Sequence, residues 1–282
     1  MDPVQAVVPA ARAVYYVALV ILFGASVFPL YVGQAGRDAL SRGQAAVLSA
    51  AALVGLLAWL WAFAASLDDT GDVLTTVQIV LIESGFRVVW LVRLGTALVL
   101  ILAALVRPSL VAVPAAVLLA CEGWSGHAAA WGPLGSVSLA LHALCAALWL
   151  GGLMPLAEVV RSSYREGGDL PAAEKALRRF SNVAMLAVAG IAVTGAINTW
   201  HVLGASVAFT DAYVHVLALK IALVALMIGL AALNRFRFLP QVREANSALL
   251  LRSLVGSIAA EQVIGLLVLL DVGVLGTMNP HG

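Results

Sequence analysis

The chain has 282 residues, of which 62% are hydrophobic and only 11% are charged, and its formal net charge is +1. Soluble domains have roughly 25% charged residues, so this chain has too few polar side chains to cover a soluble core. The composition therefore excludes a soluble globular protein and predicts a chain that crosses a membrane several times. The near-neutral charge gives no indication of a nucleic-acid partner, and the sequence has no nucleotide-binding motif.

The apolar stretches are long enough for helices of about 20 residues, and they lack the alternating pattern of a membrane β-barrel. We predict an all-α integral membrane protein, a single membrane domain over residues 1–282, built as a bundle of eight transmembrane helices. The segment 68–86 is amphipathic in part and is a candidate for an interfacial helix on the outer face. In chain order, the expected spans are 7–32, 44–66, 86–106, 109–126, 134–159, 180–203, 213–234 and 249–278.

The charged loops predict the orientation of the bundle. Lys and Arg gather in the loops after spans one, three, five and seven, which marks these loops as cytoplasmic. Both termini are therefore expected on the outer, periplasmic side, and Arg87 and Arg93 at the outer part of span three are exceptions. Six tryptophans near the predicted outer boundary are interpreted as an anchoring aromatic belt: Trp59, Trp61, Trp90, Trp124, Trp131 and Trp200.

Spans one and five share a spacing pattern. Tyr15 precedes Gly24 by the same spacing as His142 precedes Gly151, and a proline follows in both spans. This pattern indicates two parallel four-helix halves, residues 1–126 and 134–282.

All five histidines fall in the outer half of the bundle or outside it under this orientation. His142 lies about two turns into span five among apolar residues, and ionisable side chains at such depth are rare and usually functional. Cys145 and Trp149 follow at i+3 and i+7 on the same helical face. Imidazole is the commonest metal ligand, and a thiolate favours Cu(I). The residues therefore make His142 a candidate metal ligand, with His127 at the outer boundary and Cys145 as further candidates.

Simpler interpretations exist for several of these residues. A cysteine such as Cys145 is commonly a small packing residue in a membrane helix, and Gly151 and Gly152 let helices approach closely. A histidine at a span boundary costs little free energy, because its polar ring lies at the edge of the hydrocarbon core, so it needs no functional explanation. The sequence leaves open whether the site includes other residues of the outer side: His201, His215, His281, Glu122 and Met278.

Two further charged residues lie deep in the last two spans. Lys220 is near the middle of span seven, and Glu261 is near the middle of span eight. Because neither would be stable unpaired in hydrocarbon, we expect both to face the bundle interior, paired or bridged by water.

A set of motifs follows in a fixed order along the chain. They are Arg12, Gly126-His127-Ala128, the run from His142 to Pro155, Arg179-Phe180-Ser181, Thr194-Gly195 with Asn198, the segment from Tyr213 to Lys220, Asn234-Arg235, Pro240, Glu261 and Pro280. In these motifs the chain resembles the copper resistance protein D family of bacterial inner-membrane copper transport proteins. The resemblance covers most of the chain and is strongest over residues 123–280.

The resemblance implies copper transport or uptake across the bacterial inner (cytoplasmic) membrane, for copper homeostasis or resistance, and no enzymatic activity. It supports His127 and His142 as the metal-handling positions, with Cys145 as a weaker third. A buried site with two or three ligands favours Cu(I), and Cu(II) stays open. Relatives can have a histidine near the position of Tyr15. Because this chain has tyrosine there, the resemblance does not carry a span-one ligand over to it. Many relatives work beside a small periplasmic copper-binding protein (CopC-like), which would here be a separate chain.

Two other functions stay open at this point. A membrane protein that binds b-type haem and transfers electrons would use facing histidines, such as His142 with His215 or His127 with His201. A copper-delivery or assembly factor would hand the metal to another protein without transporting it.

Overall fold

The computed structural model of the chain describes residues 3–37, 39–69, 71–125, 131–163, 169–204, 210–241 and 248–278. Throughout these ranges the regular structure is helical and no strand forms. Seven of the described helices are long and apolar enough to cross a membrane, in agreement with the predicted all-α bundle. They are α1 (Pro3–Val32), α2 (Arg42–Ala65), α4 (Arg87–Val106), α7 (Gly132–Ser162), α8 (Leu170–Leu203), α9 (Ala212–Leu233) and α11 (Ala248–Leu275).

The segment expected as the fourth span is shorter than a full span. It consists of a 3-10 turn (Pro108–Val111), helix α5 (Ala112–Ala120) and a second 3-10 turn, η3 (Cys121–Trp124). A helix needs about 20 residues to cross the hydrocarbon core, so the count of eight full spans is not confirmed. The segment ends against α7, because a Cβ on Gly123 would collide with the carbonyl group of Ser136.

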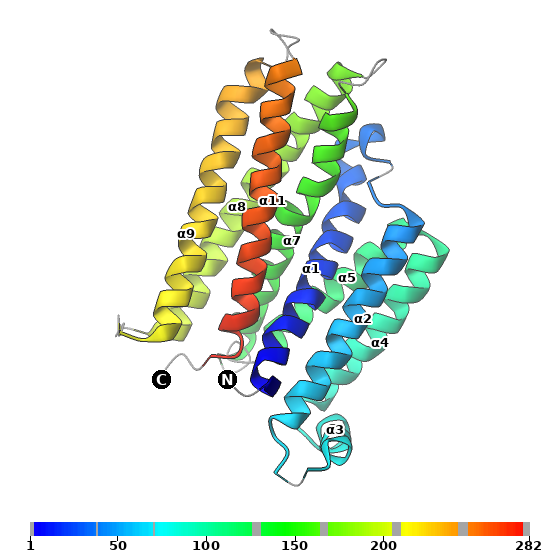
Figure 1. Cartoon of the computed structure of the whole chain (residues 1–282), viewed down its shortest axis with the longest axis vertical. Helices are drawn as coiled ribbons and strands as arrows, with labels where there is room; N and C mark the ends of the chain where they lie inside the picture. Colours follow the sequence, from blue (N-terminus) through cyan, green and yellow to red (C-terminus); the bar gives the residue numbers. More distant parts are fainter. Residues whose placement is uncertain are drawn as a thin grey trace.

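Helix α3 (Val73–Ile82) is the amphipathic part of the segment 68–86. Asp72 caps this helix, since its carboxylate accepts hydrogen bonds from the Thr75 amide at 3.2 Å and the Thr75 hydroxyl at 2.6 Å. These bonds stabilise the charged form and lower the pKa of the Asp72 carboxyl. In Figure 1, α3 lies across the direction of the long helices at one end of the bundle.

The end of the bundle at which α3 lies is also the end at which α1 begins and α11 finishes (Figure 1). We call it the outer end, after the orientation that the charged loops predict, and we call the opposite end the inner end.

The helices α1 and α7 cross at the centre of the bundle through two glycines. A Cβ added to Gly24 would collide with the backbone of Gly151, and a Cβ added to Gly151 would collide with the carbonyl group of Val20. On either side of this crossing lie two apolar clusters. One is formed mainly by α1, α2, α4 and α5, and the other mainly by α7, α8, α9 and α11. The division into two four-helix halves stays a prediction.

Gly151→Ala is expected to lower the free energy of unfolding by about 3 kcal/mol, the upper end of typical overpacking costs, because the obstacle is backbone rather than a movable side chain. Thermal unfolding of the purified protein in detergent measures this loss. The matched control is Gly229→Ala in α9, where an added Cβ meets nothing within 4 Å. Equal melting temperatures for the two variants would contradict the close crossing.

Candidate metal-handling site in the outer cavity

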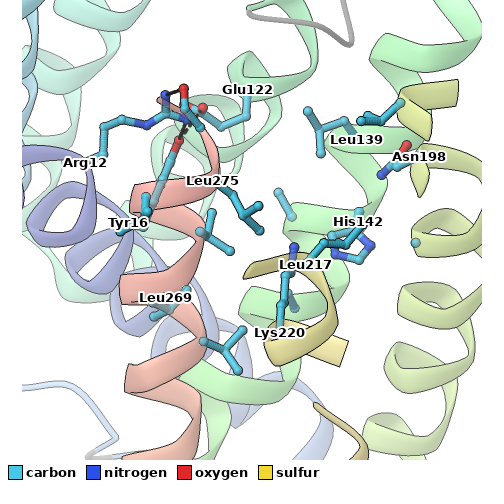
Figure 2. Close-up of a pocket in the computed structure, with 18 of the residues that line it drawn as sticks. Arg12, Tyr16, Glu122, Leu139, His142, Asn198, Leu217, Lys220, Leu269 and Leu275 are labelled. Atoms are coloured by element: carbon cyan, nitrogen blue, oxygen red, sulfur yellow. Dashed lines mark hydrogen bonds between the residues drawn. The ribbon is translucent and has the colours of Figure 1, made fainter. Parts of the chain in front are cut away.

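A cavity of about 1670 Å³ occupies the outer half of the bundle. Its walls come from α1, α7, α8, α9 and α11, with contributions from α2, α4 and η3, and they are mostly apolar. It extends to residues at the outer end, such as Ser66 and Met278. Figure 2 shows the polar residues that line it in two groups, with Arg12, Tyr16 and Glu122 on one side and His142 and Lys220 on the other. We call this space the outer cavity.

His142 lines the outer cavity from α7 and is oriented by a hydrogen bond to α8. Its Nδ1 lies 3.0 Å from the hydroxyl oxygen of Thr194, and that hydroxyl donates its own proton to the carbonyl of Gly190 at 2.5 Å. The Thr194 hydroxyl therefore accepts from His142, which places the imidazole proton on Nδ1. In the neutral ring Nε2 then has a free lone pair, the arrangement found in metal-ligating histidines.

Cys145 contacts α8 rather than the outer cavity. It is not among the lining residues, and a Cβ on Gly190 would lie 2.7 Å from its sulfur. His142 faces the same helix, because a Cβ on Gly195 would lie 3.4 Å from its Cε1. The two side chains thus share the α7 face that the i, i+3 spacing predicts, while the thiol occupies a packing position. Its role as a ligand stays a prediction.

His127 and His281 lie outside the described residues, so the structure does not place them. Among the residues that are described, no three His, Cys, Asp or Glu side chains come together as a metal-binding group. His142 is the described histidine on the cavity wall.

The other two described histidines have local contacts. The ring of His201 lies 5.4 Å from that of Trp131, and its Nδ1–H donates to the carbonyl of Ile197 at 2.8 Å. His215 is exposed near the start of α9. Neither lines the outer cavity, so the pairing of His142 with His215 that a haem would need does not form there.

Glu122, considered as a further metal ligand, has both carboxylate oxygens engaged. Arg93 donates to one at 2.8 Å, and the hydroxyl of Tyr16 donates to the other at 2.7 Å. Arg12 in turn donates to the Tyr16 hydroxyl at 2.8 Å and to the carbonyl of Gly276 at 2.8 Å. This network joins η3 to α1, α4 and the end of α11, and we call it the arginine network.

The ring of Trp59 contacts both guanidinium groups of the arginine network. The Arg12 and Arg93 groups lie 4.7 and 4.5 Å from its ring centre, close enough for cation–π attraction. Trp59 and Trp90 are buried, at 6% and 3% exposure, so they do not belong to the predicted aromatic belt. Arg93 was an exception to the charge rule because it is paired inside the bundle rather than exposed at its surface.

Lys220 and Glu261 have different surroundings, which corrects the prediction that they pair. Glu261 accepts a hydrogen bond from the side-chain amide of Asn234 at 2.5 Å and does not line the outer cavity. Lys220, by contrast, lines the outer cavity from α9. Sequence reasoning missed Asn234 as the partner of Glu261 because the two residues lie 27 positions apart on different helices.

Comparisons with known proteins agree with this architecture. The family model described as "Copper resistance protein D-like, N-terminal domain" matches residues 1–137, and that described as "Copper resistance protein D" matches residues 174–275. The inner membrane protein YebZ of Escherichia coli K12 is 27% identical over 96% of this chain and 97% of its own length. Copper resistance protein D of Pseudomonas syringae pv. tomato is 28% identical over 96% of each chain. No solved structure matches the chain.

The bundle of apolar helices around a large cavity defines the chain as a multi-pass helical membrane protein. The two matching models and the full-length relatives show that it belongs to the copper resistance protein D family, and its place is the inner membrane.

Proposed function

We propose that the protein transports copper ions across the inner membrane and that His142 binds the ion in the outer cavity. The observation that carries this proposal is the position of His142 on the wall of a large cavity, with its Nδ1 in contact with the Thr194 hydroxyl. Nε2 is then the ring nitrogen left for a metal. A neutral imidazole fixed through its other nitrogen is a suitable copper ligand. The Lys and Arg distribution supports an outer cavity that faces the periplasm.

The rest of the ligand set would come from residues on the same side. His127, on the adjacent segment of the chain, is the first candidate. The thioether of Met278 lines the outer cavity and suits Cu(I). Two or three neutral ligands favour Cu(I) over Cu(II). A periplasmic copper-binding protein (CopC-like) as a separate chain is the proposed donor.

The sequence has no nucleotide-binding motif, so transport would be passive, coupled to protons or driven by exchange with partners. A capture site at the outer side favours uptake. Copper uptake into proteoliposomes separates this function from a delivery factor, which would bind copper without accumulating it inside the vesicles. A Soret band in the visible spectrum of the purified protein would instead favour the haem alternative.

Thr194→Val should weaken copper binding about 10–100-fold, the usual cost of losing an outer-shell partner of a ligand histidine. The substitution keeps the shape of the side chain but removes the acceptor that fixes the imidazole proton on Nδ1. Competition with a Cu(I) chelator measures the affinity. Thr194→Ser keeps the hydroxyl and should bind as the wild type does; equal affinity for the valine variant would contradict the assigned role.

A further inference from the structure

The outer cavity lies partly between two helices that follow each other in the chain but make little contact. Both α8 and α9 line the cavity, yet along the described residues α9 packs against α11 rather than against α8. Consecutive helices usually lie side by side. α9 is also the least buried of the long helices, and Met227 is the one buried residue between Ala212 and Leu233. One face of α9 is therefore without a helical partner.

The wall that α8 contributes to the cavity has the pattern of a helix-packing face. Cavity-lining residues recur on it at alternating intervals of four and three positions, and they are Ala192, Ala196, Thr199 and Leu203. This spacing places side chains in one line along a helix, as in helices that pack lengthwise on each other. Alanine and threonine are among the small residues that let a second transmembrane helix approach closely.

The wall that α9 contributes has the same spacing with larger side chains. Its residues in line are Leu217, Ile221, Val224 and Ile228. Ile221 and Ile228 are 56% and 39% exposed. Branched aliphatic side chains can insert between the small residues of a facing helix, as knobs into holes. The two lines of residues, which we call the α8–α9 seam, thus match as a helix pair although they lie apart here.

The two helices are tied together only in their inner parts. Arg235 lies in the π-helical turn Asn234–Phe238 that continues α9, and its Nη1 donates to the Ser181 hydroxyl at 2.6 Å and to the Asn182 side chain at 3.1 Å. Both acceptors belong to α8. The described residues of the outer parts make no such bond between α8 and α9. π-helical turns are rare and frequently occur at functional sites. The inner tie is therefore a fixed point about which the outer parts can approach each other.

The seam passes beside His142. A Cβ on Gly195, the neighbour of Ala196, would lie 3.4 Å from the Cε1 of the imidazole. A helix packed onto α8 at Ala196 would therefore cover His142, and it would fill part of the outer cavity.

We propose that α8 and α9 close along the seam, so that the outer cavity alternates between the open form of this structure and a closed form in which α9 covers His142. The importance of this movement for copper rests on the proposed transport function, whereas the movement itself does not. In the closed form the two helices should reach the separation of packed helices, about 8–10 Å between their axes. A bound ion would then be shut off from the outer end until the seam opens.

Disulfide trapping in the full-length protein tests the closed form. Ala196→Cys with Ile221→Cys places one thiol on each side of the seam, and a disulfide forms only where the two Cα atoms come within about 4.4–6.8 Å. Oxidation with diamide, which brings no copper, should give the disulfide-linked peptide pair that mass spectrometry identifies. Val193→Cys with Leu219→Cys is the matched control, because these residues of the same helices are 61% and 54% exposed and do not line the cavity. The control should give no linked pair.

Copper uptake into proteoliposomes tests what the closure does. The oxidised seam pair should take up no copper, and reduction of the disulfide, followed by removal of the reductant, should restore the rate. The control pair should transport at the same rate before and after oxidation.

The outcomes separate the closure from the proposed function. A seam pair that yields no more linked peptide than the control overturns the closure, whatever the wild type transports. A seam pair that is fully linked and still takes up copper at its reduced rate overturns the role of the closure in transport. A wild-type protein that takes up no copper contradicts the proposed function, while the linked peptide would still support the closure.

Discussion

His142→Ala should lower the initial rate of copper uptake into proteoliposomes by more than about 100-fold, since losing even an outer-shell partner of a ligand histidine costs about 10–100-fold. The reason is that His142 is the described histidine on the wall of the outer cavity. With the proton on Nδ1, its Nε2 has the lone pair that could bind a metal. No neighbouring described residue offers an equivalent nitrogen at that depth.

His215→Ala is the matched control for this experiment. It removes the same side chain from an exposed position that does not line the outer cavity, so uptake should stay at the wild-type rate. A His142→Ala variant that transports copper as fast as this control would contradict the assignment of His142 as a ligand.

Glu122→Ala should lower the free energy of unfolding by about 3–5 kcal/mol, the cost of leaving a buried charge without its partner. Arg93 has a side chain that is 1% exposed and would lose its ion pair, while the Tyr16 hydroxyl would lose its acceptor. Thermal unfolding in detergent measures the change, and the loss of stability should be accompanied by weaker docking of η3 onto α4.

Two further variants isolate the effect of burial. Glu174→Ala breaks an ion pair with Arg178, whose side chain is 59% exposed, and should cost less than about 0.5 kcal/mol because water screens the pair. Combining Glu122→Leu with Arg93→Met removes both buried charges and should recover most of the stability. Equal losses for Glu122→Ala and Glu174→Ala would contradict a buried arginine network.

The long spans could be predicted because each is a contiguous run of apolar residues, and hydropathy along the sequence detects such runs directly. The short α5 segment could not be separated from a full span by hydropathy, since its residues are as apolar as those of its neighbours. The partner of Arg93 could not be predicted from the sequence either. Glu122 lies 29 positions away, and the contact exists only because η3 packs beside α4.

In the candidate site, too, the features set by helical spacing could be predicted, whereas those set by packing between helices could not. The depth of His142 and its shared face with Cys145 follow from helical spacing, whereas the Thr194 bond that selects the free nitrogen depends on how α8 packs against α7. Trp59 was assigned to the aromatic belt because it lies near the outer end of its predicted span. Its contact with two guanidinium groups is set by α1 and α4, which no local pattern in α2 encodes.

Copper K-edge X-ray absorption of the copper-loaded protein tests the central claim most directly. The proposed site predicts a Cu(I) edge with imidazole scattering from His142, and both copper content and that scattering should fall in His142→Ala while His215→Ala keeps the wild-type spectrum. An identical spectrum and copper content in His142→Ala, or a wild-type protein that retains no copper, would contradict it.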